Sequence, residues 1–269
     1  MGLGFGRFLG RKGTASENQT ARINRHGRKA PEGPLKRIER HKVFMSTDEL
    51  LKPKYYGEKL SVAVDVLIFT VADNHVEVLL EKRDDEPFRG YYALPGAIMD
   101  VDESLEETVT RCLREEIGVT DIYTEQLYTW GELRRDPRRR VLSVSYIALV
   151  NKTRCHPVPG ERVSEVRWQE VSTANVNELR GKLAYDHGDM VAYALERLKG
   201  KVEYTSIAFH MMGEEFTLSA LQHVYEILLG KNLYKANFRK KIAEFVEETG
   251  GMVVGDPHRP SKLYRWNGK

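Results

Sequence analysis

The sequence predicts an α+β fold in which a mixed sheet lies between helices as an α/β/α sandwich, followed by a small winged helix-turn-helix domain. Between Leu60 and about Gly200, β-rich segments alternate with segments of helical periodicity. From Phe216 the pattern changes to two short helices followed by a small hairpin. Alternating strands and helices are typical of a sheet covered by helices, and two helices joined by a short turn are the geometry of a helix-turn-helix.

Local signals place the expected elements. Residues 61–70 are β-rich, and Asp73 and Asn74 favour a turn before a second strand over 76–81. The remaining expected elements are a helix over 105–117, strands over 141–150 and 165–168, helices over 186–198, 217–230 and 235–249, and a hairpin over 252–265.

Composition indicates an ordinary globular protein. Hydrophobic residues make up 41% and charged residues 30% of the 269 residues, enough for one large domain or two modest ones. Cys112 and Cys155 form neither a CxxC metal motif nor a disulfide framework, which fits a reducing compartment. No apolar run approaches the roughly 18 residues of a membrane-spanning helix. Arg7 interrupts the apolar residues at the N-terminus, which is not the pattern of a secretory signal. We therefore expect a cytoplasmic protein with no membrane partner.

The chain divides into three regions. Residues 1–42 carry eleven Lys and Arg against three Glu and show no apolar periodicity, so they cannot bury enough surface to offset the cost of ordering. We expect this basic arm to be disordered, and it would either touch DNA phosphates or be a dispensable leader, since Met45 would also open a domain well. Residues 43–200 would form the α+β domain and 201–269 the winged helix-turn-helix domain. The net charge of +3 is too mild to prove a nucleic-acid partner by itself.

The segment from Leu94 to Val119 resembles the Nudix box, whose pattern runs glycine, five residues, Glu, seven residues, then Arg-Glu-apolar-x-Glu-Glu-x-Gly-apolar. The residues themselves favour a loop-helix-loop. Ser104 and Glu107 form a capping box, and Gly118 suits the left-handed conformation that ends a helix. The helix would bury the face that carries Leu105, Val109 and Leu113.

The box departs from its pattern where an active enzyme would hold metal. Box carboxylates bind a divalent cation against a pyrophosphate, so several oxygen ligands must share one face. Cys112 replaces the first Glu of the Arg-Glu pair, and Cys is a poor magnesium ligand. Ala97 replaces the leading glycine. We favour a non-catalytic scaffold that requires no cofactor. The alternative is slow Mg²⁺-dependent hydrolysis. The vestigial box positions are Glu103, Arg111, Glu115 and Glu116.

Basic residues flank the box on both sides. Arg83 ends a segment similar to the strand that leads into Nudix pockets, and residues 135–141 resemble the Arg-Asp-Pro-Arg-x-Arg-Val stretch of Nudix domains that take ADP-ribose. Arginines clamp phosphates bidentately, although a solvated basic turn would show the same pattern. Asp186 would also serve as an ordinary N-cap. The candidate ligand-binding residues are Arg83, Arg135, Arg138, Arg140, Asp186 and His187.

The C-terminal helices predict a DNA-binding face. Phe238, Ile242 and Phe245 of the second helix would face the core, which leaves a polar and basic face outward near its N-terminus. A recognition helix meets base edges and phosphates there, and a hairpin wing would reach the backbone or minor groove. A solvated face is the alternative for each residue. The candidate DNA-binding residues are Asn237, Arg239, Lys240, Lys241, Arg259 and Lys262.

Residues 55–269 closely resemble the Nudix-related transcriptional regulator (NrtR) family, on the motifs Phe216-Thr-Leu, Val224-Tyr-Glu, Asn237-Phe-Arg-Lys-Lys and His258-Arg-Pro-Ser-Lys-Leu-Tyr-Arg265. The resemblance implies a homodimeric repressor or regulator of NAD metabolism that binds double-stranded operator DNA and senses ADP-ribose or a related nucleotide. Some branches of the family control sugar-utilisation operons, so a sugar effector stays open. Two different functions would also fit the sequence: an ADP-ribose pyrophosphatase with an accessory C-terminal domain, and a phosphate-binding protein whose C-terminal domain contacts protein.

Overall fold

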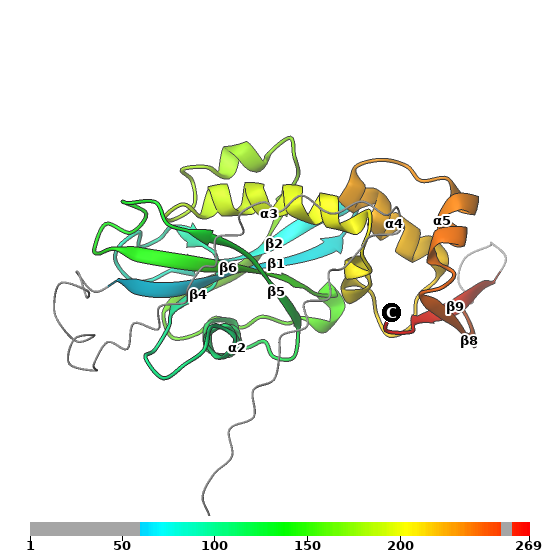
Figure 1. Cartoon of the computed structure of the whole chain (residues 1–269), viewed down its shortest axis with the longest axis horizontal. Helices are drawn as coiled ribbons and strands as arrows, with labels where there is room; N and C mark the ends of the chain where they lie inside the picture. Colours follow the sequence, from blue (N-terminus) through cyan, green and yellow to red (C-terminus); the bar gives the residue numbers. More distant parts are fainter. Residues whose placement is uncertain (1–59, 254–259) are drawn as a thin grey trace, which may run out of the picture. The chain divides into compact units, whose positions relative to one another are not determined.

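The computed structural model describes residues 60–253 and 260–269, all of which belong to one compact unit, Tyr56–Lys269 (Figure 1). The expectations for the basic arm, residues 1–42, and for Arg259 lie outside the described residues. None of the helices in the described ranges is long and apolar enough to cross a membrane.

A seven-stranded sheet forms the centre of the first domain, with strand order β3-β2-β1-β6-β5, β4 paired with β1, and β7 paired with β2. The β1–β6 pairing is parallel and the other pairings are antiparallel, so the predicted mixed sheet is confirmed. The strands are β1 (Ser61–Ala72), β2 (His75–Arg83), β3 (Tyr92–Ala93), β4 (Gly96–Ile98), β5 (Tyr123–Trp130), β6 (Val141–Leu149) and β7 (Val163–Val171).

Two helices cover opposite faces of this sheet, α2 (Leu105–Ile117) on one and α3 (His187–Val202) on the other (Figure 1). Successive residues of β1 therefore enter two different cores. Val66 and Ile68 pack in the cluster that contains α2, whereas Leu67 and Phe69 pack in the cluster that contains α3. A strand buried on both faces explains the continuous apolar run of β1. Short 3-10 helices lie at Lys152–Arg154, Val176–Leu179 and Ile207–Met211.

The ends of α2 are set by local sequence, as predicted. The Ser104 hydroxyl accepts a hydrogen bond from the backbone N–H of Glu107, and the Glu107 carboxylate accepts one from the backbone N–H of Ser104. Gly118 ends the helix with φ 66°, a left-handed conformation that favours glycine. These caps position the box helix against the sheet.

The C-terminal domain consists of α4 (Leu218–Leu229), α5 (Lys235–Ile242), β8 (Val246–Val253) and β9 (Ser261–Trp266). The predicted helix over 235–249 is wrong beyond Ile242, because residues from Val246 onward pair with β9 as a strand. The register of this hairpin shifts between Glu248 and Met252, around Gly250 with φ 81°. Long-range pairing overrides the helical periodicity there.

Helix α4 packs against the first domain as well as against the hairpin of its own domain. Leu221 and Leu228 of α4 belong to the same buried cluster as Leu198 and Val202 of α3. Thr217 caps α4 by accepting a hydrogen bond from the backbone N–H of Ala220. The two domains therefore share one hydrophobic core.

Substitutions at two separate glycines, Gly160 and Gly200, test the packing at the end of α2. A Cβ on Gly160 would lie 2.1 Å from the backbone oxygen of Glu115, whereas one on Gly200 of α3 would meet nothing within 4 Å. We expect Gly160→Ala to lower the free energy of unfolding by about 1–3 kcal/mol or more. Gly200→Ala should raise it by about 0.5–1 kcal/mol, since alanine favours the helix. Thermal and urea unfolding measure both, and a neutral Gly160→Ala would contradict this packing.

Candidate functional site

A cleft of about 500 Å³ opens beside the start of α3, a size that suits a small-molecule ligand. It is lined by residues from β1, β2, α2, the loop before β6 and the box loop, by which we mean residues 94–104 before α2. The charged side chains that line it are arginines and carboxylic acids, with Tyr185 and His187 beside them. The charged residues are Asp65, Glu81, Arg83, Asp85, Glu86, Asp100, Arg111, Glu116, Arg135, Asp136, Arg138, Arg139 and Arg162.

A buried ion network forms the inner wall of this cleft. The Arg135 guanidinium donates to both carboxylate oxygens of Asp186, at 2.8 and 3.0 Å, and to Asp65 at 3.1 Å. Ser143 also donates a hydrogen bond to Asp65. Burial raises the pKa of Asp65, but His187, Arg135 and Ser143 outweigh it and hold that pKa well below its usual value of 3.8. Asp65 is therefore ionised at neutral pH.

His187 joins this network to the box loop. Its Nδ1 accepts a hydrogen bond from the backbone N–H of Leu94 at 2.9 Å, and its Nε2 lies 3.4 Å from Asp65. Because Nδ1 is the acceptor, the ring proton belongs on Nε2, facing Asp65. The structure thus brings together three of the predicted ligand-binding residues, Arg135, Asp186 and His187, but engages their polar atoms with one another. Asp186 begins α3 without a side-chain capping bond, because Arg135 takes its carboxylate.

The remaining predicted ligand arginines have different settings. Arg138 pairs with Asp136 at 2.8 Å, lines the cleft, and donates to the hydroxyl of Tyr185 at 3.3 Å. Arg83 also lines the cleft, and its guanidinium lies 5.2 Å from the centre of the Tyr185 ring. Arg140 instead donates to the backbone oxygens of Glu132 and Gly131, and it is not among the described residues that line the cleft.

Tyr185 is a cleft residue that the sequence analysis did not select. It lies between two cationic side chains and adopts φ 53°, which is uncommon outside glycine. The only sequence signal for it was its place directly before Asp186 and His187. Its ring offers a surface on which a base or sugar can stack.

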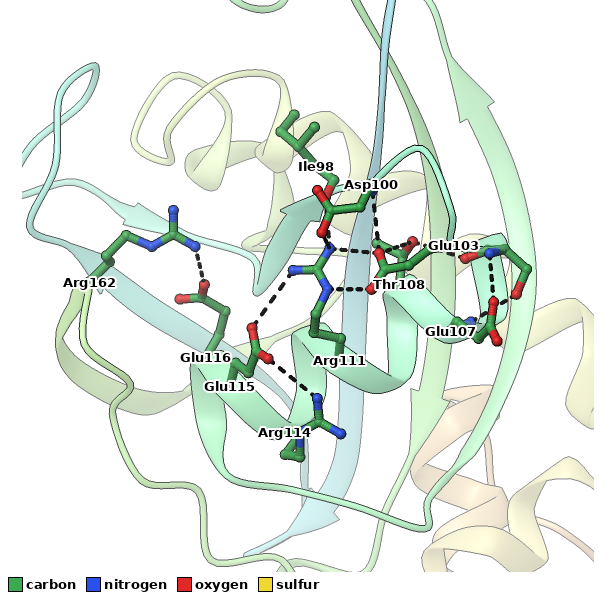
Figure 2. Close-up of polar contacts among 11 residues, drawn as sticks. Ile98, Asp100, Glu103, Glu107, Thr108, Arg111, Arg114, Glu115, Glu116 and Arg162 are labelled. Atoms are coloured by element: carbon green, nitrogen blue, oxygen red, sulfur yellow. Dashed lines mark hydrogen bonds and ion pairs between the residues drawn. The ribbon is translucent and has the colours of Figure 1, made fainter.

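The box carboxylates are largely occupied by arginines (Figure 2). Arg111 donates to both oxygens of Glu103, at 2.6 and 2.8 Å, and makes a longer contact of 3.7 Å with Glu115 one turn further along the helix. Glu115 also contacts Arg114 at 3.3 Å and is half exposed, whereas Glu116 is buried and accepts from Arg162 at 2.9 Å. Cys112 is buried in the core on the α2 side of the sheet. Cys112 and Glu116 are thus buried, whereas Glu115 is half exposed.

Glu81 of β2 is a second residue that the sequence analysis missed. It is 4% exposed, and its Oε2 is buried with no hydrogen-bond partner in the described part of the chain. Burial, and then the nearby Glu116, raise the pKa of Glu81 well above its usual value. In the described ranges no three His, Cys, Asp or Glu side chains converge as a metal site.

The predicted DNA-binding residues within the described ranges lie on α5 and β9. Phe238 and Ile242 of α5 are buried, as predicted, and Asn237, Arg239 and Lys240 are exposed. The basic residues at the two ends of this surface are already engaged. Lys241 donates to the backbone oxygen of Glu203 at 2.6 Å, and Lys262 of β9 pairs with Glu248 of β8 at 2.8 Å.

Comparison with protein families agrees with this two-part architecture. Residues 59–193 match the NUDIX domain model, and residues 208–266 match the model of the NrtR DNA-binding winged helix domain. The chain belongs to the NrtR family. The resemblance and the fold class predicted from sequence are thereby confirmed.

Individual relatives of this NrtR-family protein include regulators and an enzyme. The ADPR-responsive transcriptional repressor NtrR of Acinetobacter baylyi is 37% identical over 210 residues, 76% of this chain and 81% of that protein. The ADP-ribose pyrophosphatase of Methanocaldococcus jannaschii is 34% identical over 131 residues, 49% of this chain and 70% of that enzyme. The crystal structure of Shewanella oneidensis NrtR complexed with a 27mer DNA is 38% identical with a TM-score of 0.67, covering 77% of this chain and 93% of that one.

The depressed pKa of Asp65 predicts a pH dependence of stability in this NrtR-family protein. A carboxyl whose pKa is lower in the folded than in the unfolded state stabilises the fold above the unfolded value, and this contribution is lost as pH falls toward the folded value. We expect Asp65→Asn to cost about 1–3 kcal/mol at pH 7. The difference from the wild type should shrink as pH falls from about 5 to 2. Chemical unfolding across this range measures it.

The control is Asp102→Asn, which removes an exposed carboxylate of the box loop. It should leave both the stability at pH 7 and its pH profile close to those of the wild type. A constant difference between Asp65→Asn and the wild type at every pH would contradict the ionised state of Asp65.

Proposed function

We propose that this protein is a transcriptional repressor whose winged helix domain binds operator DNA and whose Nudix-fold domain releases that DNA when it binds ADP-ribose or a related nucleotide. One observation carries the proposal. A single chain of the NrtR family combines a winged helix domain with exposed Asn237, Arg239 and Lys240 and a cleft lined by Arg83 and Arg138. The Acinetobacter baylyi relative, named an ADPR-responsive repressor, supports the same combination.

The cleft suits a nucleotide because it offers positive charge and an aromatic face together. Arg83, Arg138 and Arg162 line it, and guanidinium groups bind phosphate oxygens in pairs. Tyr185 lies between two of these arginines and would stack against a ribose or base. Arg135, Asp186 and His187 would act behind this surface, by holding the start of α3 and the box loop in place. Arg140 would do the same for the loop before β6.

The Nudix-fold domain would bind its effector without turning it over and without a required cofactor. Hydrolysis of a pyrophosphate needs a metal-activated water held by several hard ligands. Glu103 is bound on both oxygens by Arg111, Glu115 is half exposed, and Cys112 provides no hard ligand. The vestigial box would therefore serve the fold and the cleft.

Operator binding would involve a homodimer acting in the cytoplasm. Two winged helix domains would read successive major grooves about 34–36 Å apart, and a palindromic operator would match the two-fold symmetry. In each copy Asn237, Arg239 and Lys240 would contact bases or phosphates. Lys241 would join them only after its contact with Glu203 opens, and Lys262 would reach the backbone from the hairpin.

Electrophoretic mobility shift with the upstream DNA of the protein's own gene tests this proposal. We expect a specific complex that ADP-ribose releases and that a sugar such as arabinose leaves intact. Release by the sugar alone would assign the effector to the sugar-sensing branch. A protein that shifts no specific DNA under any condition would contradict the repressor role.

Arg239 provides a residue-level prediction. Arg239→Ala should weaken operator binding by about 1–3 kcal/mol and relax sequence preference if the side chain reads a base. Arg197→Ala, which removes an exposed charge from α3, is the matched control and should bind normally. Fluorescence anisotropy with operator and scrambled DNA measures both. A loss that is equal on the two DNAs would assign Arg239 to phosphate, and no loss would remove it from the interface.

The second candidate is an ADP-ribose pyrophosphatase with an accessory C-terminal domain. The Methanocaldococcus jannaschii enzyme favours it, because 131 residues of this chain match it at 34% identity. Incubation of purified protein with ADP-ribose and Mg²⁺ decides between the two. Release of AMP at ordinary enzymatic rates would overturn the non-catalytic interpretation, whereas unchanged ADP-ribose agrees with it.

A further inference from the structure

Two lysines of the winged helix domain meet at Glu203, the residue that ends α3. Lys231 contacts Oε1 of Glu203 at 2.9 Å, and Lys241 donates to the backbone oxygen of Glu203 at 2.6 Å. A third lysine is also near, because Lys231 first, and then Lys241 and Lys199, lower the pKa of Glu203. One carboxylate therefore lies among three lysines, and the cluster keeps a net positive charge.

The cluster borders a hollow of about 450 Å³ between the end of α3, α4 and α5. The polar side chains that line it include Glu203, Lys231, Asn237 and Lys241. Asn237 and Lys241 are both exposed and lie four residues apart on α5, so they share one face of that helix. Both are predicted DNA-binding residues. The carboxylate of Glu203 thus lies beside a surface that is expected to meet phosphates.

The turn between α4 and α5 holds the backbone of Lys231 in place. Its backbone N–H donates to the backbone oxygen of Glu226 at 3.2 Å. The Glu226 carboxylate accepts a second hydrogen bond from the backbone N–H of Leu233, at 2.8 Å. The side chain of Lys231, in contrast, is 57% exposed. The turn therefore presents a cation at a defined place on the surface of the domain.

The ion pair between Lys231 and Glu203 can be exchanged at little cost. Both side chains are more than half exposed, and ion pairs at such sites add little to stability. A lysine gains more at a DNA phosphate, because neutralising that phosphate releases a condensed counterion. A duplex that reaches this surface would therefore displace the carboxylate from Lys231.

We propose that the Glu203 carboxylate occupies, in the DNA-free protein, the place that a backbone phosphate of the operator takes at Lys231, and that docking exchanges one anion for the other. Lys231 is then a further DNA-contacting residue, and Glu203 is a competitor built into the chain. Because phosphates carry no sequence information, this competition lowers the affinity for every duplex alike. The inference rests on the proposed operator-binding function.

The salt dependence of DNA binding tests the exchange. In the wild type a phosphate replaces a carboxylate at Lys231, so this contact releases no net counterion. In Glu203→Gln the same contact releases one, which should steepen the slope of log K against log salt concentration by about 0.9 and tighten binding about fivefold at about 0.15 M salt. Fluorescence anisotropy of the full chain with operator and scrambled duplexes measures both, and the gain should be equal on the two DNAs. An unchanged affinity and slope overturns the proposal.

Glu178→Gln is the matched control. It also breaks an exposed contact between an acid and a lysine, that of Glu178 with Lys182 at 3.6 Å, but in the first domain. Its affinity and slope should equal those of the wild type. Equal tightening in Glu178→Gln and Glu203→Gln would reveal a general effect of net charge and would contradict an exchange at Lys231.

A double variant identifies the partner of the phosphate. Adding Lys231→Ala to Glu203→Gln should remove the whole gain and return the slope to that of the wild type, because no cation is left at this place. Both positions are exposed, so melting temperatures close to that of the wild type are expected. A gain that persists in the double variant overturns the assignment to Lys231.

These measurements separate the exchange from the proposed function. If the wild type prefers the operator and Glu203→Gln binds no more tightly, the exchange falls and the repressor function stands. If the wild type shows no preference for the operator, but Glu203→Gln tightens binding to both duplexes through Lys231, the exchange stands and the repressor function falls.

Discussion

The buried contact of Arg135 with Asp65 and Asp186 is the constraint on which the cleft depends. It joins the loop before β6 to β1 and to the start of α3, and His187 extends it to the backbone of Leu94 in the box loop. Buried ion pairs must offset their own desolvation and add little net stability over apolar packing. Their effect here is geometric, because four separate segments must meet for every charge and hydrogen bond of this network to be satisfied.

Features set by neighbours in the chain could be predicted from the sequence. The box helix begins at Ser104 and ends at Gly118 as expected, because its caps are made by residues within four positions of each other. The end of α5 could not be predicted in this way. Residues from Val246 continue a helical period, but pairing with Trp266 and the rest of β9 decides their conformation.

The same distinction between local and tertiary determinants applies to the residues of the site. The sequence identified arginines 135, 138 and 140 as one phosphate-binding group, yet burial sets them apart: Arg135 faces inward to carboxylates, Arg138 faces the cleft, and Arg140 binds backbone oxygens. Glu81 could not be found at all, because a single acid in a strand has no periodic signal. Its burial beside the cleft, which Glu116 of α2 also lines, is set by the tertiary fold.

Helix α3 gives the two domains a common rigid element. Asp186 begins it at the cleft, and Glu203 ends it beside the winged helix domain, where Lys231 and Lys241 contact it. Sixteen residues at about 1.5 Å each span about 24 Å, and apolar side chains of α3 and α4 belong to one core. A ligand changes the affinity for DNA only if it binds two arrangements with different free energies. The N-terminus of α3 is held by charges that line the cleft, and its C-terminus contacts two lysines of the winged helix domain. A shift of this helix would therefore change the contacts in the cleft and in the winged helix domain together.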